Sequence, residues 1–400
     1  MGIREMEKWQ QYRQAFPHVG RKIYLNHAAL SPVHQLTIDA VSRYHQDRAL
    51  DDIEYWPALL NVKSRFKELV GRLINADPDY IAITTNTSMG LNWLAQGLSW
   101  KPGDRILLNN FEFPSNVMPF LNLKHQGVEI DYVQHREGRI DVADIAARIT
   151  PKTRMISVSF VEFLNGFRND LAAIGELCRK HDLLFVVDGI QGLGAMQLDA
   201  RELGIDFLAC GGQKWLMWPL GTAFFYTSPR IFDRVRPMAT GWLSVEKAWD
   251  FFNYELDLLP TAERFEPGMI NAPGLVGAIA SLEMFLDVGM ETIEKRITDN
   301  VDFLYGRLQE SGYRLFTPAE KHQRAGIVTF YHQKAEDLHA HLTERKIQVS
   351  LRDGMVRVAP HFYNTTAEIE TFCEAVAAFD RRHQRRPVWS QNLKETATQV

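Results

Sequence analysis

Short apolar runs alternate with helical stretches from about residue 81 to residue 227 of this chain. Residues 89–98 illustrate the helical stretches, because Leu91, Leu94 and Leu98 recur on one face at the spacing of an α-helix. The apolar runs with β character cover residues 81–84, 105–108, 128–133, 155–160, 183–187, 207–210 and 222–226. Alternating strands and helices over this length predict an α/β fold with a mainly parallel, doubly wound sheet.

The pattern changes after Pro273. Residues 275–310 follow a mostly helical period, two β runs at 326–331 and 355–358 flank another helix, and a last helix is predicted over 366–381. These elements predict a second, smaller α+β domain. We therefore divide the chain into an N-terminal segment (1–20) that we expect to pack with the small domain, a large domain (21–289), the small domain (290–385) and a polar tail (386–400).

Composition narrows the classes of function. The 400 residues carry a formal net charge of −4, so no basic excess favours nucleic acid or an anionic membrane as a partner. The three cysteines, Cys178, Cys210 and Cys373, are scattered and form no CxxC pair, so we expect no metal site. The polar N-terminus and the lack of a stretch of about 18 apolar residues predict a cytoplasmic protein.

Two charged residues follow buried β runs. Asp188 ends the run 183–187, and Lys214 comes after the run 207–210. The carboxyl ends of parallel strands form the ligand side of an open sheet. A lysine that can form a Schiff base and an acid that can pair with a pyridinium nitrogen are what pyridoxal phosphate (PLP) requires. Apolar neighbours such as Trp215 would lower the pKa of the Lys214 amine, and Gln191 would reach the ring hydroxyl. The ordinary alternatives are a surface lysine and a structural acid.

Three further segments offer partners for such a cofactor. Thr87 or Ser88 would cap the helix that follows the run 81–84, and free N–H groups there suit a phosphate, although simple capping is the alternative. Phe113 follows another strand and could stack on a planar ring, or belong to the core. Arg357, flanked by apolar residues, could grip a carboxylate through two hydrogen bonds, or lie on an edge strand in solvent.

Taken together, these segments resemble the class V aminotransferase family, which includes cysteine desulfurases, selenocysteine lyases, kynureninases and isopenicillin N epimerases. The resemblance runs from about Tyr24 to Thr365. The most specific segment is Val187-Asp188-Gly189-Ile190-Gln191 followed by Gly211-Gly212-Gln213-Lys214. Residues 264–268 (Arg-Phe-Glu-Pro-Gly) and residues 356–358 leading into Tyr363-Asn364 are also recognisable.

The resemblance implies a PLP enzyme of fold type I, with a seven-stranded sheet covered by helices on both faces, and a homodimer with shared active sites. Lys214 would form the internal aldimine and shuttle protons, while Asp188 would keep the ring nitrogen protonated. The remaining cofactor contacts would come from Thr87, Ser88, Phe113, Gln191, Gln213 and Asn271, the last reaching the phosphate of the partner subunit. Arg357 would bind the α-carboxylate of a small amino acid, in a pocket near His27 and Trp56.

Several positions depart from the family pattern. Gly211 and Gln213 replace the usual serine and histidine before the lysine, Met269 replaces a threonine, and Phe163 replaces an asparagine near the ring hydroxyl. No cysteine lies between Phe330 and Arg357, where a desulfurase keeps its persulfide-forming residue. We therefore expect an aminotransferase or a C–S/C–C lyase rather than a persulfide-transferring desulfurase.

Three alternatives remain. An amino-acid epimerase would use the same fold and cofactor. A PLP-fold protein without catalysis, acting as a binding module, is disfavoured by Lys214, Asp188 and Arg357. A nicotinamide oxidoreductase is disfavoured because the glycines at 189, 192 and 194 do not fit the dinucleotide fingerprint.

Overall fold

A seven-stranded sheet forms the centre of the large domain in the computed structural model, which describes residues 7–51, 53 and 56–383. Its strand order is β2-β8-β7-β6-β5-β3-β4. The strands are β2 (Ile81–Thr84), β3 (Arg105–Asn109), β4 (Glu129–Val133), β5 (Thr153–Ser159), β6 (Leu184–Asp188), β7 (Phe207–Gly211) and β8 (Ala223–Thr227). Strand β8 runs antiparallel to both of its neighbours, β2 and β7, and the other six strands of the sheet share one direction. The predicted mainly parallel sheet is confirmed.

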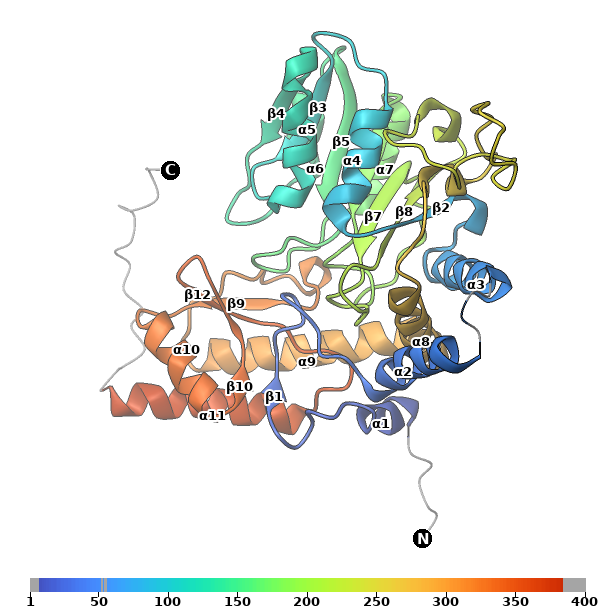
Figure 1. Ribbon diagram of the computed structural model, residues 1–400. Coiled ribbons are helices and arrows are strands. Elements are labelled where there is room, and N and C mark those ends of the chain that lie inside the picture. The colour runs from blue at the N-terminus through green and yellow to red at the C-terminus, as the bar shows by residue number, and fades with distance from the viewer. Residues whose placement is uncertain (1–6, 52, 54–55, 384–400) are drawn as a thin grey trace.

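Alternate residues of each strand point into two separate cores. Val187 and Leu208 belong to one core together with helix α7 (Leu171–Lys180). Val186 and Ala209, one residue away, belong to the other core with helix α4 (Thr87–Gly97). Because side chains alternate along a strand, this division places helices on both faces of the sheet (Figure 1). The other helices of this part are α2 (Gln35–Leu50), α3 (Trp56–Ile74), α5 (Met118–Leu121), α6 (Val142–Arg148) and α8 (Ala272–Val288).

The C-terminal part forms a smaller layer of helices on short strands, drawn in the lower part of Figure 1. Its antiparallel sheet has the order β11-β12-β9, with β9 (Val328–Tyr331), β11 (Ser350–Arg352) and β12 (Met355–Val358). The helices are α9 (Met290–Glu310), α10 (Ala335–Glu344) and α11 (Thr366–Arg382). Strand β1 (Ile23–Tyr24) pairs in parallel with β10 (Ile347–Gln348), which brings the start of the chain to this part.

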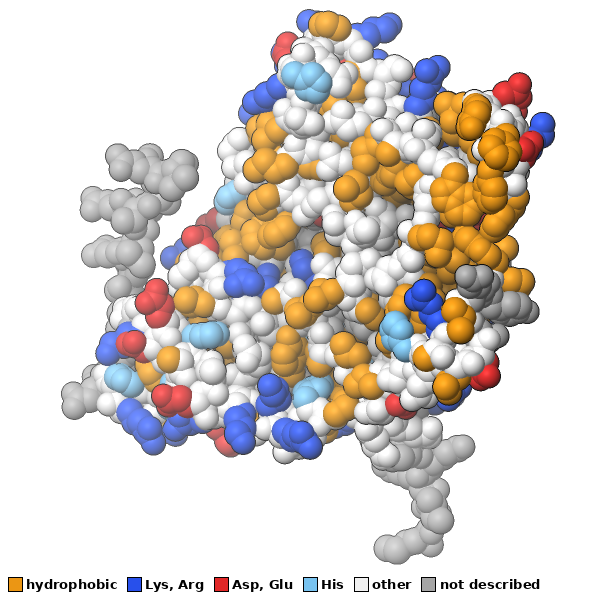
Figure 2. Space-filling model, in the orientation of Figure 1, with side chains coloured by type: hydrophobic (Ala, Val, Ile, Leu, Met, Phe, Trp, Pro, Cys, Tyr) orange, Lys and Arg blue, Asp and Glu red, His pale blue; other side chains and the backbone are white. Residues whose placement is uncertain are grey.

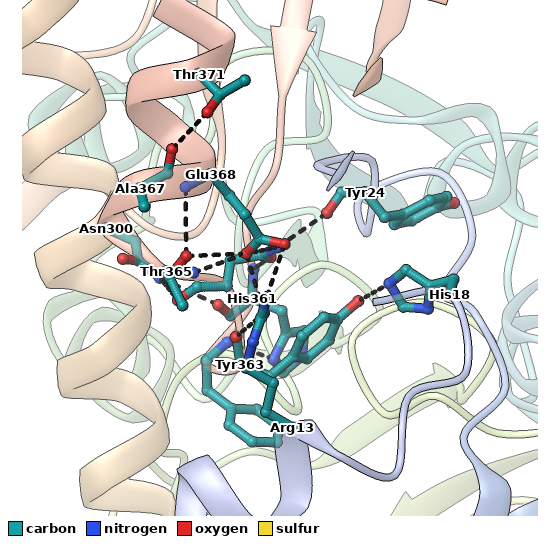
Figure 3. Close-up of polar contacts among 12 residues, drawn as sticks. Arg13, His18, Tyr24, Asn300, His361, Tyr363, Thr365, Ala367, Glu368 and Thr371 are labelled. Atoms are coloured by element: carbon teal, nitrogen blue, oxygen red, sulfur yellow. Dashed lines mark hydrogen bonds and ion pairs between the residues drawn. The ribbon is translucent and has the colours of Figure 1, made fainter. Parts of the chain in front are cut away.

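The N-terminal segment contacts the start of α11 (Figure 3). Arg13, the last residue of helix α1 (Lys8–Arg13), donates to the Tyr363 carbonyl at 2.7 Å and forms a two-bond ion pair with Glu368. The Phe16 ring stacks on the Tyr363 ring with centroids 3.9 Å apart. These contacts join residues 13–16 to residues 363–368, whereas the expected division of the chain into domains stays a prediction. Residues 1–6 and the predicted tail 386–400 lie outside the described residues.

The predicted cap of α4 was wrong by one residue. Asn86, not Thr87 or Ser88, is the N-cap, and its side chain accepts the Met89 N–H at 2.8 Å. Helix α7 is capped by Asp170, whose side chain accepts the Ala173 N–H at 3.0 Å. Among the described residues no single helix is long and apolar enough to cross a membrane. Helices α8 and α9 together pass that test by length and composition alone, with a bend of 83° between them.

Candidate active site

Lys214 lies in a tight turn that follows β7. The Gly212 N–H donates to the Thr222 carbonyl at 3.1 Å, and the Trp218 N–H donates to the Gly212 carbonyl at 2.8 Å. A Cβ on Gly212 would lie 2.0 Å from the Trp218 ring, so only glycine lets this ring close over the turn. The turn therefore holds the Lys214 backbone firmly at the carboxyl end of the sheet.

The Lys214 side chain points to the ring of Phe113, with Nζ 5.3 Å from the ring centroid. The pKa of the Lys214 ammonium is lowered to about 8, chiefly by burial; Asp188 opposes this shift and Arg357 contributes to it. The amine and the Asp188 carboxylate interact but form no direct ion pair within the described chain. Only a neutral amine attacks an aldehyde, and the lowered pKa gives Lys214 more of this form near neutral pH.

Asp188 presents one unpaired oxygen. Its Oδ1 accepts the Ile190 N–H at 2.9 Å, whereas the buried Oδ2 has no hydrogen-bond partner in the described structure. Burial raises the pKa of Asp188 to about 6, and the Ile190 N–H and Lys214 oppose that shift. Because an unpaired buried carboxylate oxygen is unfavourable, this atom is suited to a positively charged donor such as a protonated ring nitrogen.

Gln191 connects the Asp188 segment to the lysine turn. Its Nε2 donates to the Ala28 carbonyl at 3.0 Å, and its Oε1 accepts the Trp215 Nε1–H at 2.9 Å. The Trp215 carbonyl in turn contacts the His361 Nε2 at 2.9 Å. These bonds give Gln191 a structural role; its predicted contact with a ring hydroxyl stays a prediction.

The N-terminus of α4 offers a site for a phosphate. Met89 and Gly90 donate their N–H groups to Asn86, so Thr87 and Ser88 keep theirs without a partner in the described chain. The Thr87 hydroxyl accepts the Gly211 N–H at 2.9 Å and so ties the helix to the end of β7. Two free N–H groups and the helix dipole favour an anion here.

Two other predicted residues flank this helix end. The Ser88 hydroxyl donates to the Ser115 hydroxyl at 2.8 Å, and a recess of about 470 Å³ lined by Ser88, Phe113 and Ser115 opens beside it. The Gln213 side chain lies over the end of β7, since a Cβ on Gly211 would be 2.5 Å from its Oε1. The structure therefore brings the predicted phosphate residues to one place.

Arg357 is a buried cation without an acidic partner. It lies on β12 with 2% of its surface exposed, and its Nη1 donates to the Phe163 carbonyl at 2.6 Å. Its buried Nε has no hydrogen-bond partner, and no described acidic residue forms an ion pair with it. The pKa of Arg357 is lowered to about 9, chiefly by burial and also by the positive charge of Arg352. A carboxylate would supply the missing countercharge.

Three predicted residues have partners elsewhere. His27 is buried, with Nδ1 on the Ala359 carbonyl at 2.8 Å and Nε2 on the Tyr363 hydroxyl at 2.7 Å, an arrangement that favours a structural role. Trp56 packs edge-on against Trp242 and Trp249 at 5.7 and 4.9 Å. Asn271 caps α8 through the Gly274 N–H at 3.1 Å and is exposed. The predicted roles of all three towards substrate or cofactor stay predictions.

Sequence reasoning missed two buried acids beside Asp188, namely Glu112 and Glu162. Glu112 accepts the Ser159 N–H at 2.7 Å and the Ser159 hydroxyl at 2.6 Å, and Ser159 lies opposite Asp188 in the sheet. The available signal was their position, because each acid follows the apolar run of a buried strand. Their meeting depends on β3, β5 and β6 being neighbours, which no local pattern reveals.

The comparisons with known proteins agree with this geometry. The family model described as "Aminotransferase class-V" matches residues 23–372. The chain belongs to the class V aminotransferase family. It is therefore a PLP-dependent enzyme of the transferase or lyase kind, as the predicted resemblance indicated.

Curated relatives match this class V enzyme over nearly its whole length. A probable cysteine desulfurase of Pyrococcus abyssi is 29% identical over 91% of this chain and 95% of its own. An uncharacterized aminotransferase, YcbU, of Bacillus subtilis is 26% identical over 92% of this chain and 97% of its own. Among solved structures, the apo cysteine desulfurase from Thermococcus onnurineus NA1 has a TM-score of 0.87 at 24% identity, covering 95% of this chain and 100% of that one. The last similarity establishes the fold.

The residues of this class V enzyme fit the cofactor. The unpaired Asp188 Oδ2 suits the protonated ring nitrogen, and the free N–H groups of Thr87 and Ser88 suit the phosphate. Lys214 supplies an amine of lowered pKa that interacts with Asp188 and lies over the Phe113 ring. Each requirement of PLP thus has a matching group at the carboxyl edge of the sheet.

Proposed function

We propose that this enzyme binds a small α-amino acid through Arg357 and breaks a bond at its α- or β-carbon, as an aminotransferase or a C–S lyase. One observation carries the proposal: Arg357 is a buried cation that has no acidic partner among the described residues and acts electrostatically on Lys214. A substrate carboxylate on Arg357 would place the amino group and the α-carbon towards the Lys214 amine.

The residues of the chain have separate roles in this mechanism. PLP, when bound, draws electrons from the substrate α-carbon. Asp188 would stabilise a positive charge on the ring nitrogen, and the Lys214 amine, with its lowered pKa, would carry a proton to and from the substrate α-carbon. Phe113 covers Lys214 on one side and the buried Trp215 follows it in sequence, so both limit the access of water to the amine. Arg357 orients the bond to be broken.

A protein thiol has no place in this proposal. Cys178 and Cys210 are buried, and burial raises the pKa of Cys178 to about 12 and that of Cys210 well above its usual value. Cys373 lies on α11 and burial raises the pKa of its thiol to about 12 as well. Because the thiolate is the nucleophile, none of these residues is suited to carry sulfur. If the enzyme cleaves a C–S bond, we expect it to release the sulfur product directly.

The test follows the visible absorbance band of the cofactor joined to Lys214. Adding an amino acid shifts this band, and Arg357→Gln should raise the concentration needed for half of the shift by about 10- to 100-fold, because a charge-assisted bidentate contact is lost. An amine without a carboxylate should respond equally in both proteins. Arg345→Gln, which removes an exposed arginine of the same domain, is the control. An unchanged concentration in Arg357→Gln would place the carboxylate elsewhere.

Product assays decide the reaction. Keto acid formed without ammonia indicates transamination, whereas sulfide or persulfide formed with ammonia and keto acid indicates C–S cleavage. A Cys178→Ser, Cys210→Ala, Cys373→Ser variant should keep its rate of sulfur release, because no thiol relay is proposed. Loss of sulfur release in this variant, with its cofactor band intact, would contradict the proposal.

We also propose that the enzyme works as a homodimer. Large apolar side chains gather along the right-hand edge of Figure 2, over the loop drawn in yellow in Figure 1. They form the aromatic patch, which we define as Trp242, Trp249, Phe251, Phe252 and Tyr254. An exposed cluster of this kind favours a protein partner. A second copy is consistent with the predicted shared active sites.

A further inference from the structure

Three carboxylates meet beneath the cofactor side of the sheet. Asp188 ends β6, Glu162 follows β5, and Glu112 follows β3. The Asn109 Nδ2 donates to Glu112 at 2.7 Å and to Glu162 at 3.2 Å, so one amide nitrogen bridges the two glutamates. Ser159 donates to Glu112 and lies opposite Asp188, and the Phe160 N–H donates to the Asp188 carbonyl at 2.8 Å. The three acids thus share one hydrogen-bonded layer.

Neutral donors alone hold the two glutamates. Besides Asn109, their partners are Ser159 for Glu112 and the Asn169 Nδ2 for Glu162, at 3.0 Å. Neither glutamate forms an ion pair with any described residue. The Glu162 side chain is fully buried, and its Oε2 has no hydrogen-bond partner in the described structure. A bare, buried anionic oxygen is unfavourable, but a protonated oxygen is not.

The surrounding charges identify which acid is ionised. Lys214 favours the charged form of Asp188, and it also influences Cys210, which burial keeps as a thiol. Arg357 donates to the carbonyl of Phe163 rather than to Glu162. His135, which packs on Phe111, has its pKa lowered by burial and is neutral at pH 7. Asp188 is therefore the only one of the three acids with a cation acting directly on it.

The acidities follow the same order. Burial raises the pKa of Asp188 to about 6 and that of Glu112 to about 7, and it raises the pKa of Glu162 well above its usual value. The negative charge of Glu112 adds to the shift at Glu162. Near neutral pH, Glu162 is therefore the acid that holds a proton most strongly. As the pH rises, Asp188 is the first of the three acids to become ionised.

We propose that Glu112 and Glu162 act as a pair of positioning residues that holds one proton, with Glu162 as the protonated member, so that Asp188 remains the ionised partner of the cofactor ring. This inference rests on the proposed function, since it assigns the pair a role towards PLP. It follows from three buried carboxylates at adjacent strand ends, of which only Asp188 faces a cation. The pair takes part in no bond-breaking step.

The first test needs no cofactor. Infrared spectra of the apoprotein at pH 8, where Glu112 and Asp188 are mostly ionised, should still show the C=O band of a buried carboxylic acid. The band should disappear in Glu162→Gln, which keeps the shape of the protonated acid, and remain in the exposed control Glu202→Gln. Absence of the band from the wild-type protein at pH 8, or its persistence at that pH in a folded Glu162→Gln, would overturn the proposal.

The second test uses the holoenzyme. The pH at which the Schiff-base absorbance band changes should be the same in Glu162→Gln as in the wild type. In Glu112→Gln it should fall by about half a unit or more, because a negative charge that stabilises the protonated imine and ring is removed. If the pH of this change shifted equally in the two variants, the proposed difference in protonation between Glu112 and Glu162 would be overturned. A wild-type protein without any such band would contradict the proposed function instead, and the infrared test would still decide the state of Glu162.

Discussion

At the residue scale, the lowered pKa of Lys214 predicts how fast the apoenzyme takes up PLP. With a pKa of about 8, roughly a tenth of the amine is neutral at pH 7, compared with about one part in 3,000 for an ordinary lysine. Only the neutral amine reacts, so the rate should rise with pH and level off above about pH 8. Stopped-flow absorbance between pH 6 and 9.5 measures this profile.

Two variants frame that measurement. Lys180→Ala, at the exposed end of α7, should keep the profile, and Lys214→Ala should form no Schiff-base band. A rate that still rises tenfold per pH unit above pH 9 would show that Lys214 keeps an ordinary pKa. The lowered pKa of Lys214 sets the direction of this effect. A lysine with a lowered pKa loses its proton at a lower pH, so the rate levels off at a lower pH than for an ordinary lysine.

The sequence identified the residues whose chemistry depends on their own strand. Asp188, Lys214 and Arg357 follow or interrupt apolar runs, and a charge in that setting needs a partner. Gln191 was identified through its spacing from Asp188. Its hydrogen bonds to Trp215 and Ala28 were not predicted, because Ala28 lies more than 160 positions away in sequence. The pair Glu112 and Glu162 was not identified from the sequence for the same reason. Contacts between distant segments depend on the strand order, which local patterns do not encode.

At the element scale, a buried ion cluster joins α3 to the segment 262–266. Glu266 contacts the Lys63 Nζ at 2.8 Å and the Lys67 Nζ at 2.9 Å, and it accepts the Ile83 N–H at 3.0 Å. Glu266→Gln would leave two buried ammonium groups with Glu263 as their remaining acidic partner. We expect the free energy of unfolding to fall by about 3 kcal/mol, because removing one member of a buried ion pair leaves an uncompensated charge.

Urea unfolding at pH 7 measures this loss. The control is Asp299→Asn, which removes an exposed ion pair within α9 and should change the free energy of unfolding by less than about 0.5 kcal/mol. A loss below about 1 kcal/mol in Glu266→Gln would mean that water or Glu263 compensates the two lysines. Through this cluster the glutamate of the Arg-Phe-Glu-Pro-Gly segment fixes the segment against α3.

Elements were easier to predict than their ends. The seven strands of the sheet were predicted because each is a short apolar run, and helix α4 because apolar residues such as Leu91 and Leu94 recur at helical spacing. The direction of β8 was not predictable from such a run, since parallel and antiparallel strands buried on both faces look alike. The cap of α4 was misplaced because Asn86, Thr87 and Ser88 are all good capping residues, and only the backbone decides which one lies outside the helix.

At the scale of the whole molecule, the aromatic patch predicts that the enzyme is a dimer. Phe252 and Tyr254 are 86% and 87% exposed, and Trp249 is 57% exposed, so one copy alone leaves large rings in water. A Phe252→Asp, Tyr254→Asp variant should separate the copies, because burying two carboxylates in an apolar interface is unfavourable. Light scattering behind a sizing column should give about twice 45.9 kDa for the wild type and about 45.9 kDa for the variant. Gln309→Asp, which adds negative charge at the exposed end of α9, should remain a dimer. A wild-type mass of one chain at micromolar concentration, or an unchanged dimer in the double variant, would contradict the assignment of this patch.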